Sequence, residues 1–276
     1  MKFLDFLSTT QSLQEANKGT EFERKTYETL EKWLAGVVDT DAEVDRMISA
    51  LHRLDSHITI NTIAEIHWAG GSPTRPANLE DSGGIIADLI FVMKNGKRHF
   101  VSIKERTGST FANFGIGSNL INPRTFAVNT NSPVGQLMVE AGVDVAKVQQ
   151  GYKDRAEGVQ SEFQTEDRLS VPVVPGTELY NKIKEGWGQN YFYLREDPSQ
   201  ELGWFAMIVN GAAHKRLMTG LNIYKIRYPH NRGAGSKQVS IFFRNSVFNY
   251  ELEIRNTSGG ELPNKMQLKT ISPART

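Results

Sequence analysis

An apolar strand–turn–strand segment constrains the fold more than any other feature of this sequence. The run Ile85–Met93 is apolar except for Asp88, and a second strand-like run, Arg98–Glu105, follows the dipeptide of Asn95 and Gly96. Asn-Gly between two such runs is typical of a two-residue hairpin turn. Because both faces of the first run are apolar, we expect the hairpin to lie in a sheet that is covered on both sides.

The position of Asp88 inside the apolar run indicates a site with chemistry. A carboxylate there is costly to bury unless it is paired or bound to a metal ion. On the second run Ser102 and Lys104 alternate with two apolar residues, so a hairpin can bring both beside Asp88. A carboxylate that holds Mg²⁺ and a lysine that orients water would form a hydrolytic site. A structural Asp–Lys ion pair is the alternative.

The composition excludes several other kinds of site. The chain has 276 residues and no cysteine, which excludes a thiol nucleophile, a disulfide scaffold and a Cys-ligated zinc site. The histidines show no zinc-binding spacing. The longest apolar stretch is about half the length of a membrane-spanning helix, and the N-terminus lacks a signal-peptide core. We therefore expect a cytoplasmic protein.

Charge is distributed unevenly along the chain. The formal net charge is +1, yet Leu202–Tyr250 contains seven Lys or Arg residues, interleaved with aromatic residues, and no Asp or Glu. This pattern predicts a polyanion-binding surface, and nucleic acid is the commonest polyanion. An exposed sheet face that is merely basic is the alternative. The expected nucleic-acid contacts are Lys215, Arg216, Arg227, Arg232 and Lys237, together with Arg106, Ser109 and Asn113 in the polar loop after the hairpin.

The rest of the chain divides into a first part with helices and a β-rich second part. Helices are predicted over residues 17–35, 41–54 and 132–152, and a strand over residues 63–68. A polar connection over residues 160–176 precedes strands over 191–194, 204–209, 221–228, 239–243 and 248–254 and a loose tail. We expect an α/β fold, with residues 1–160 as the core and residues 161–276 as a β-rich basic region packed on it as one domain.

The two halves of the hairpin resemble the catalytic motif of the PD-(D/E)XK nuclease superfamily, the fold of most type II restriction endonucleases. Ala87 and Asp88 stand where that family has Pro-Asp, and the tripeptide Ser102–Lys104 stands where it has (Asp/Glu)-X-Lys. The resemblance implies a restriction-endonuclease-like core with a mixed central β-sheet flanked by helices, followed by the β-rich C-terminal region. Ser102 departs from the pattern because it occupies the position of the family's second acid.

A second segment carries the same resemblance. Lys18–Arg24 is similar to the first helix of the archaeal Holliday-junction resolvases of this superfamily, and Glu23 stands at the position of their catalytic Glu. Glu23 is thus the best candidate for the carboxylate that Ser102 lacks. Glu105 and Glu140 are the other candidates for a swapped acid, although Glu105 is expected to point away from Lys104.

The resemblance implies metal-assisted phosphodiester hydrolysis in double-stranded DNA. Asp88, Glu23 and the carbonyl of Ile103 would hold Mg²⁺, and Lys104 would position the attacking water. The chain is longer than the resolvases, so we expect a sequence-specific type II restriction endonuclease, working as a homodimer because two strands need two active sites. A structure-specific nuclease for branched DNA is one alternative. A catalytically inactive DNA-binding protein of the same fold is another, and Ser102 favours it.

Overall fold

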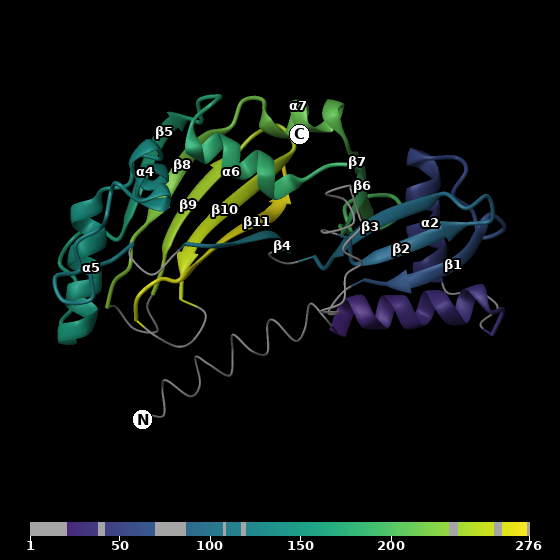
Figure 1. The fold of residues 1–276 in the computed structure, drawn as a ribbon, viewed down its shortest axis with the longest axis horizontal. Helices are drawn as coiled ribbons and strands as arrows, with labels where there is room; N and C mark the ends of the chain where they lie inside the picture. Colours follow the sequence, from purple (N-terminus) through teal and green to yellow (C-terminus); the bar gives the residue numbers. More distant parts are fainter. Residues whose placement is uncertain are drawn as a thin grey trace. The chain divides into compact units, whose positions relative to one another are not determined.

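The chain is divided into two compact units, and each is built from separate stretches of sequence. The computed structural model describes residues 21–37, 42–69, 87–106, 109–116, 120–231, 237–256 and 261–274 (Figure 1). One unit, here called the hairpin unit, contains the described residues up to 106 and residues 188–214. The other, the β-rich unit, contains the described residues of 109–187 and 215–274. The predicted boundary after residue 160 lies inside the β-rich unit.

The hairpin unit is a mixed five-stranded sheet with two helices. Its elements are a helix over residues 21–34, α2 (Ala42–Leu54), β1 (Ile63–Trp68), β2 (Leu89–Met93), β3 (Arg98–Lys104), β6 (Tyr191–Glu196) and β7 (Trp204–Val209). The strand order is β1-β2-β3-β6-β7. Neighbouring strands are antiparallel except β3 and β6, which are parallel. The predicted α/β class and the mixed sheet are therefore confirmed.

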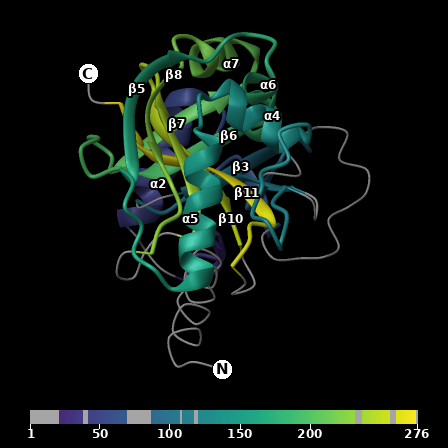
Figure 2. The same ribbon diagram turned by 90° about the vertical axis from the view of Figure 1, so that its left-hand side faces the viewer.

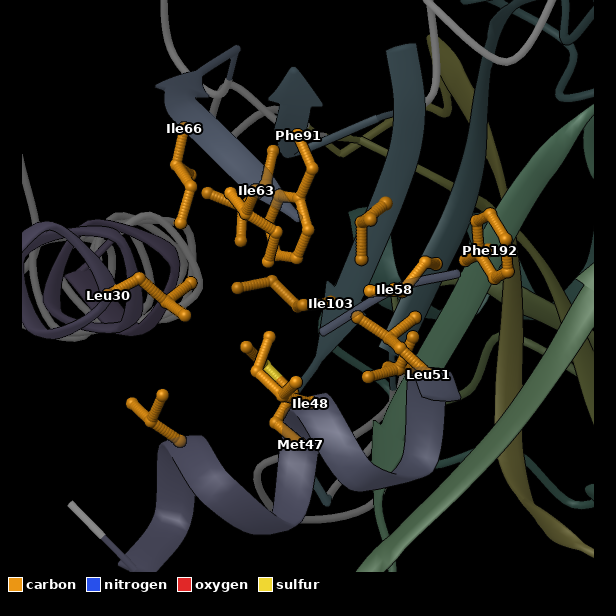
Figure 3. Packing of buried hydrophobic residues seen from close by; sticks show 14 of the residues in the cluster. Leu30, Met47, Ile48, Leu51, Ile58, Ile63, Ile66, Phe91, Ile103 and Phe192 are labelled. Atoms are coloured by element: carbon orange, nitrogen blue, oxygen red, sulfur yellow. The ribbon is translucent and has the colours of Figure 1, made fainter. Parts of the chain in front are cut away.

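The hydrophobic core of the hairpin unit lies between its helices and one face of its sheet. Leu30 of the helix over residues 21–34, Phe91 of β2 and Ile103 of β3 are each at most 1% exposed, and they point toward one another in Figure 3. Burying a side chain of this kind contributes about 1.5–3 kcal/mol. Because successive side chains of a strand point to opposite faces, Ile103 in the core directs Ser102 and Lys104 to the other face.

The β-rich unit is an antiparallel six-stranded sheet with helices on one face. Its strands are β4 (Ser109–Gly115), β5 (Glu166–Pro172), β8 (Asn222–Arg227), β9 (Val239–Arg244), β10 (Phe248–Arg255) and β11 (Lys265–Pro273), in the order β4-β11-β10-β9-β8-β5. The helices are α4 (Pro133–Glu140), α5 (Val145–Glu157) and α6 (Glu178–Trp187) (Figures 1 and 2). Trp187 stacks on Phe111 with 4.4 Å between ring centroids. Gly186 lets α6 approach this closely, because an added Cβ would lie 2.9 Å from the side chains of Ala112 and Leu268.

Several predicted elements are confirmed. The structure contains α2, β1, the β2–β3 hairpin and the strands β6 to β10 close to the predicted bounds. A helix that the sequence analysis does not predict, α7 (Gly211–Met218), lies between β7 and β8. The beginnings of the predicted helix over 17–35 and of the strand over 85–93 lie outside the described residues. In the part of the chain that the structure describes, no helix is long and apolar enough to cross a membrane.

Other predictions of local structure are wrong. The predicted helix over 132–152 is two helices, because Gly142 adopts a left-handed φ of 76° and the side chain of Asp144 caps the start of α5. The expected connection over 160–176 contains β5, the expected loop after the hairpin contains β4, and the expected loose tail contains β11. These three strands carry many polar residues. In β11, however, Met266 and Leu268 alternate with Lys265, Gln267 and Lys269, which is the period-two pattern of a half-buried strand.

Candidate active site

Asp88 lies directly before β2, and the hairpin register holds it opposite Ser102. The Asp88 amide donates to the Val101 carbonyl at 3.0 Å, and the side chain is only 9% exposed. A buried carboxylate requires hydrogen-bond donors, and three converge on Oδ2. They are Ser102 Oγ at 2.9 Å, the Ile103 amide at 2.8 Å and Lys104 Nζ at 2.7 Å. None of the described residues donates to Oδ1 in this way, so Oδ1 remains available as an acceptor.

Lys104 lies between two carboxylates. Its Nζ is 2.7 Å from Asp88 Oδ2 and 3.9 Å from Glu23 Oε1, and the Lys104 side chain is 13% exposed. Burial by itself lowers the pKa of Lys104, but the charges of Asp88 and Glu23 outweigh burial, and the pKa is raised above its ordinary value. The lysine is therefore protonated at neutral pH, where it can donate hydrogen bonds and cannot act as a general base.

Glu23 reaches the site from the first turns of the helix over residues 21–34. Packing of Leu30 into the hydrophobic core fixes this helix against the unit, and the Glu23 side chain is 18% exposed. With both carboxylates ionised, Glu23, Asp88 and Lys104 together carry a net charge of −1. A largely buried group with that charge attracts a cation more strongly than an exposed one would, because water screens it less.

Strand β6 adds two side chains that local sequence patterns do not reveal. In the parallel register Tyr193 pairs with Ser102 and Arg195 pairs with Lys104, so both lie on the face that carries the site. Both are buried, and a guanidinium nitrogen of Arg195 donates to the Arg106 carbonyl at 2.6 Å. The sequence signal for Arg195 is a charged residue at the end of an apolar strand, as for Asp88. The pairing of β6 with β3 spans too much sequence to be predicted from a local pattern.

Among the three candidate acids, Glu23 is the one that contacts Lys104. Glu140 lies in the β-rich unit, where its carboxylate accepts hydrogen bonds from the amides of Glu178 at 3.2 Å and Leu179 at 3.0 Å at the start of α6. Negative charge at a helix N-terminus is stabilising, so Glu140 has a structural role there. Glu105 is exposed and directly follows β3.

The two carboxylates fit a Mg²⁺ ion whose remaining ligands come from water and from a substrate. Mg²⁺ usually binds through one or two carboxylates and takes its other ligands from water and phosphate. Asp88 and Glu23 supply two carboxylates, and the predicted third ligand is the carbonyl of Ile103. Within the described residues, no group of three or more His, Asp or Glu side chains is arranged to hold a metal ion. A closed cage made of protein side chains alone is therefore not what this site offers.

The predicted nucleic-acid contacts differ in their surroundings. Arg106 lines a cavity of about 500 Å³ in the hairpin unit, together with Arg46 and Glu196. Lys215 and Arg216 are exposed on α7. Arg232 and the side chain of Ser109 lie outside the described residues.

The basic stretch Leu202–Tyr250 is partly neutralised by acidic residues from elsewhere in the chain. Arg227 pairs with Glu166 at 2.9 Å, and Lys237 pairs with Glu261 at 3.2 Å. Exposed ion pairs of this kind contribute at most about 1 kcal/mol, so they can be exchanged for other anions at little cost. The absence of acids from this segment of sequence therefore does not make the folded surface uniformly basic.

Comparisons with models of protein families, with curated proteins and with solved structures find no match to this chain. Any functional inference therefore rests on the geometry of the site and on the resemblance of two sequence segments to nuclease motifs. That geometry offers an oriented carboxylate, a second carboxylate and a protonated lysine between them.

Proposed function

We propose that this protein is a Mg²⁺-dependent DNA endonuclease of the PD-(D/E)XK superfamily, and specifically a homodimeric type II restriction endonuclease that acts on double-stranded DNA. The observation that carries the proposal is the contact of Lys104 with both Asp88 and Glu23. Two separate sequence resemblances single out these three residues. A chance resemblance in two distant segments gives no reason for the matching side chains to meet at one buried position.

Asp88 supplies the oriented carboxylate. Ser102 and Ile103 donate to Oδ2, which orients the carboxylate and leaves Oδ1 as an acceptor. Asp88, Glu23 and the carbonyl of Ile103 would hold the Mg²⁺. When bound, Mg²⁺ supplies positive charge at the scissile phosphate and lowers the pKa of a bound water.

Lys104 supplies a fixed positive charge. Because it is protonated, its Nζ donates a hydrogen bond to the attacking water or to a phosphate oxygen and stabilises the charge that develops there. It does not remove a proton from the water. Removal of this charge is therefore expected to lower the rate of cleavage at every pH near neutrality, without moving a basic limb of the pH profile.

Ser102 has a different role from the acid it replaces. Its hydroxyl donates to Asp88 instead of offering a metal ligand, and Glu23 supplies the second carboxylate in its place. Ser102 also favours one other function, a DNA-binding protein of this fold without catalysis, because the hairpin itself has one carboxylate fewer than the family motif.

The test is a digest of plasmid, genomic and branched DNA with Mg²⁺ and with EDTA. Wild type is compared with Asp88→Ala, Lys104→Ala and Glu23→Gln. Lys97→Ala is the matched control, because Lys97 is an exposed lysine of the same hairpin whose ion pair with Asp55 is 3.6 Å long. We expect discrete fragments that require Mg²⁺, are unchanged by the control substitution and disappear in the three site variants.

Other outcomes contradict the proposal in different ways. Smeared products would exclude sequence specificity, and selective cleavage of branched DNA would favour the structure-specific nuclease. Intact DNA in every reaction, with DNA binding retained, would mean that the fold binds DNA and has no catalysis. Cleavage that survives both Asp88→Ala and Lys104→Ala would place the chemistry elsewhere.

A further inference from the structure

One face of the six-stranded sheet in the β-rich unit carries a row of cations. The face of β8 to β11 that points away from α4, α5 and α6 is here called the polar sheet face. The pairing registers place six Lys or Arg side chains on it: Lys225, Arg227, Arg244, Arg255, Lys265 and Lys269. The same strands contribute only Glu251 and Glu253 as acids on this face. The alternate side chains, such as Leu252 and Leu268, are buried on the helix side.

The cations at one end of this face outnumber the acids that neutralise them. Glu253 is shared by Lys269 at 2.7 Å and Arg255 at 3.3 Å. Lys265 lies directly opposite Arg255 in the register, and burial, followed by the charges of Arg255 and Lys269, lowers its pKa. The Nε of Arg255 is buried without a hydrogen-bond partner among the described residues. Glu251, which lies opposite Lys269 in the register, is the second acid beside these cations. Three cations and two carboxylates leave a net charge of +1, so an anion would add favourable interactions here.

A pair of amides continues the row next to these cations. Gln267 lies between Lys265 and Lys269 on β11, and its Nε2 donates to Asn113 Oδ1 on β4 at 2.8 Å. This bond fixes which way both amides point and leaves the Asn113 amide nitrogen as a donor. Side-chain amides of this kind contact phosphate oxygens and base edges in nucleic acids.

The aromatic residues of the polar sheet face are already covered by cations. Lys225 Nζ lies 4.0 Å from the centroid of the Phe242 ring, and Arg227 lies over the same ring at 5.3 Å. Arg244 lies over Tyr224 at 5.3 Å. Sheets that bind single strands leave such rings open for stacking with bases. Here the rings hold cations in place, which favours a ligand that presents phosphates over one that presents unstacked bases.

We infer that the polar sheet face binds the phosphate backbone of double-stranded DNA, with Arg255, Lys265 and Lys269 as the central phosphate contacts and Asn113 and Gln267 as neutral contacts beside them. The choice of duplex DNA rests on the proposed function. All of these residues belong to the β-rich unit, and none of them is a residue of the candidate active site.

The test measures binding of a short labelled duplex by fluorescence anisotropy in EDTA, where Mg²⁺-dependent cleavage does not occur. Lys265→Gln is the main variant, because it removes one cation from a crowded group and should not destabilise the fold. Lys184→Gln is the matched control, since Lys184 is exposed on α6, which packs on the other face of this sheet. Asn113→Ala tests the neutral contact.

Each lost phosphate contact makes the negative slope of log affinity against log salt less steep by about 0.9. This corresponds to about eightfold weaker binding at about 0.1 M salt. We expect this change for Lys265→Gln and no change for Lys184→Gln. Asn113→Ala should weaken binding with the salt slope preserved, because no charge is lost. The single strand of the same sequence should bind more weakly than the duplex.

Wild-type affinity and slope in Lys265→Gln would overturn the inference, as would an equal loss in Lys184→Gln, which would indicate a general charge effect. Tighter binding of the single strand would overturn the choice of duplex DNA. The two proposals fail separately. Loss of cleavage in the Asp88 and Lys104 variants with unaltered binding in Lys265→Gln would leave the nuclease without this surface, and the reverse pattern would leave a DNA-binding protein without the nuclease.

Discussion

Replacement of Lys104 by methionine tests the site most directly through the free energy of unfolding. Methionine keeps the length of the side chain and removes its charge. Asp88 then loses one of three donors to Oδ2, and Asp88 and Glu23 lose the cation between them. Breaking a buried ion pair by removing one partner typically costs about 3–5 kcal/mol. Because Ser102 and Ile103 still donate to Asp88, we expect the lower end, about 3 kcal/mol at pH 8.

The assay is urea unfolding in EDTA, followed by tryptophan fluorescence. Trp33, Trp68 and Trp204 all lie in the hairpin unit, so fluorescence mainly follows its unfolding. Lys97→Met is the control, and loss of its exposed ion pair should cost at most about 1 kcal/mol. The double variant Asp88→Asn, Lys104→Met should lose about 2 kcal/mol less than the sum of the single variants. Equal stability of Lys104→Met and wild type at pH 8, or simple additivity, would refute a buried contact between these charges.

Three further predictions concern the same fold. Because the pKa of Lys104 is raised in the folded state, its charge stabilises the fold fully only below its ordinary pKa of 10.5. Above that pH, deprotonation of Lys104 should progressively lower the stability of wild type. Unfolding measured at alkaline pH should therefore show a shallower decline for Lys104→Met than for wild type. Ser102→Asp should lower the melting temperature in EDTA, because a carboxylate replaces a donor to Asp88, and Mg²⁺ should raise it more than in wild type; equal Mg²⁺ shifts would argue against a metal at this position. Gly151→Ala should destabilise the β-rich unit by about 3 kcal/mol, measured by chemical unfolding, because the new methyl group would overlap the Pro229 carbonyl oxygen; an unchanged midpoint would mean that α5 moves freely away.

The hairpin could be predicted because its information is local. Alternation of apolar residues, the Asn-Gly turn and one buried carboxylate lie within about twenty residues, and the register they imply places Asp88 opposite Ser102, as observed. Glu23 could be predicted only through a resemblance between segments. Nothing in its own surroundings on the helix distinguishes it from Glu21 or Glu28, which face solvent and pair with Lys25 and Arg24.

The division of the chain could not be predicted, because it depends on pairings between distant strands. The hairpin unit is completed by β6, which pairs in parallel with β3 after the chain has passed through the first stretch of the β-rich unit, residues 108–187. Strand β4 and strand β11 pair across about 150 residues, and their polar residues face the same side. Such strands are stabilised by neighbours that the local sequence does not specify.

The arrangement around Asp88 also bears on why a serine can occupy the position of an acid. A second carboxylate at residue 102 would face Asp88 across the hairpin, and the two would repel in a nearly dry environment. Ser102 avoids this repulsion and holds Asp88 by donating to Oδ2, while Glu23 brings negative charge from a separate helix, where Lys104 lies between it and Asp88. The cation must be displaced from Asp88, or shared with a new anion, before both carboxylates can turn to one ligand. Under the proposed function, a phosphate of the DNA substrate would provide such an anion, and this would couple assembly of the two-carboxylate site to the arrival of DNA.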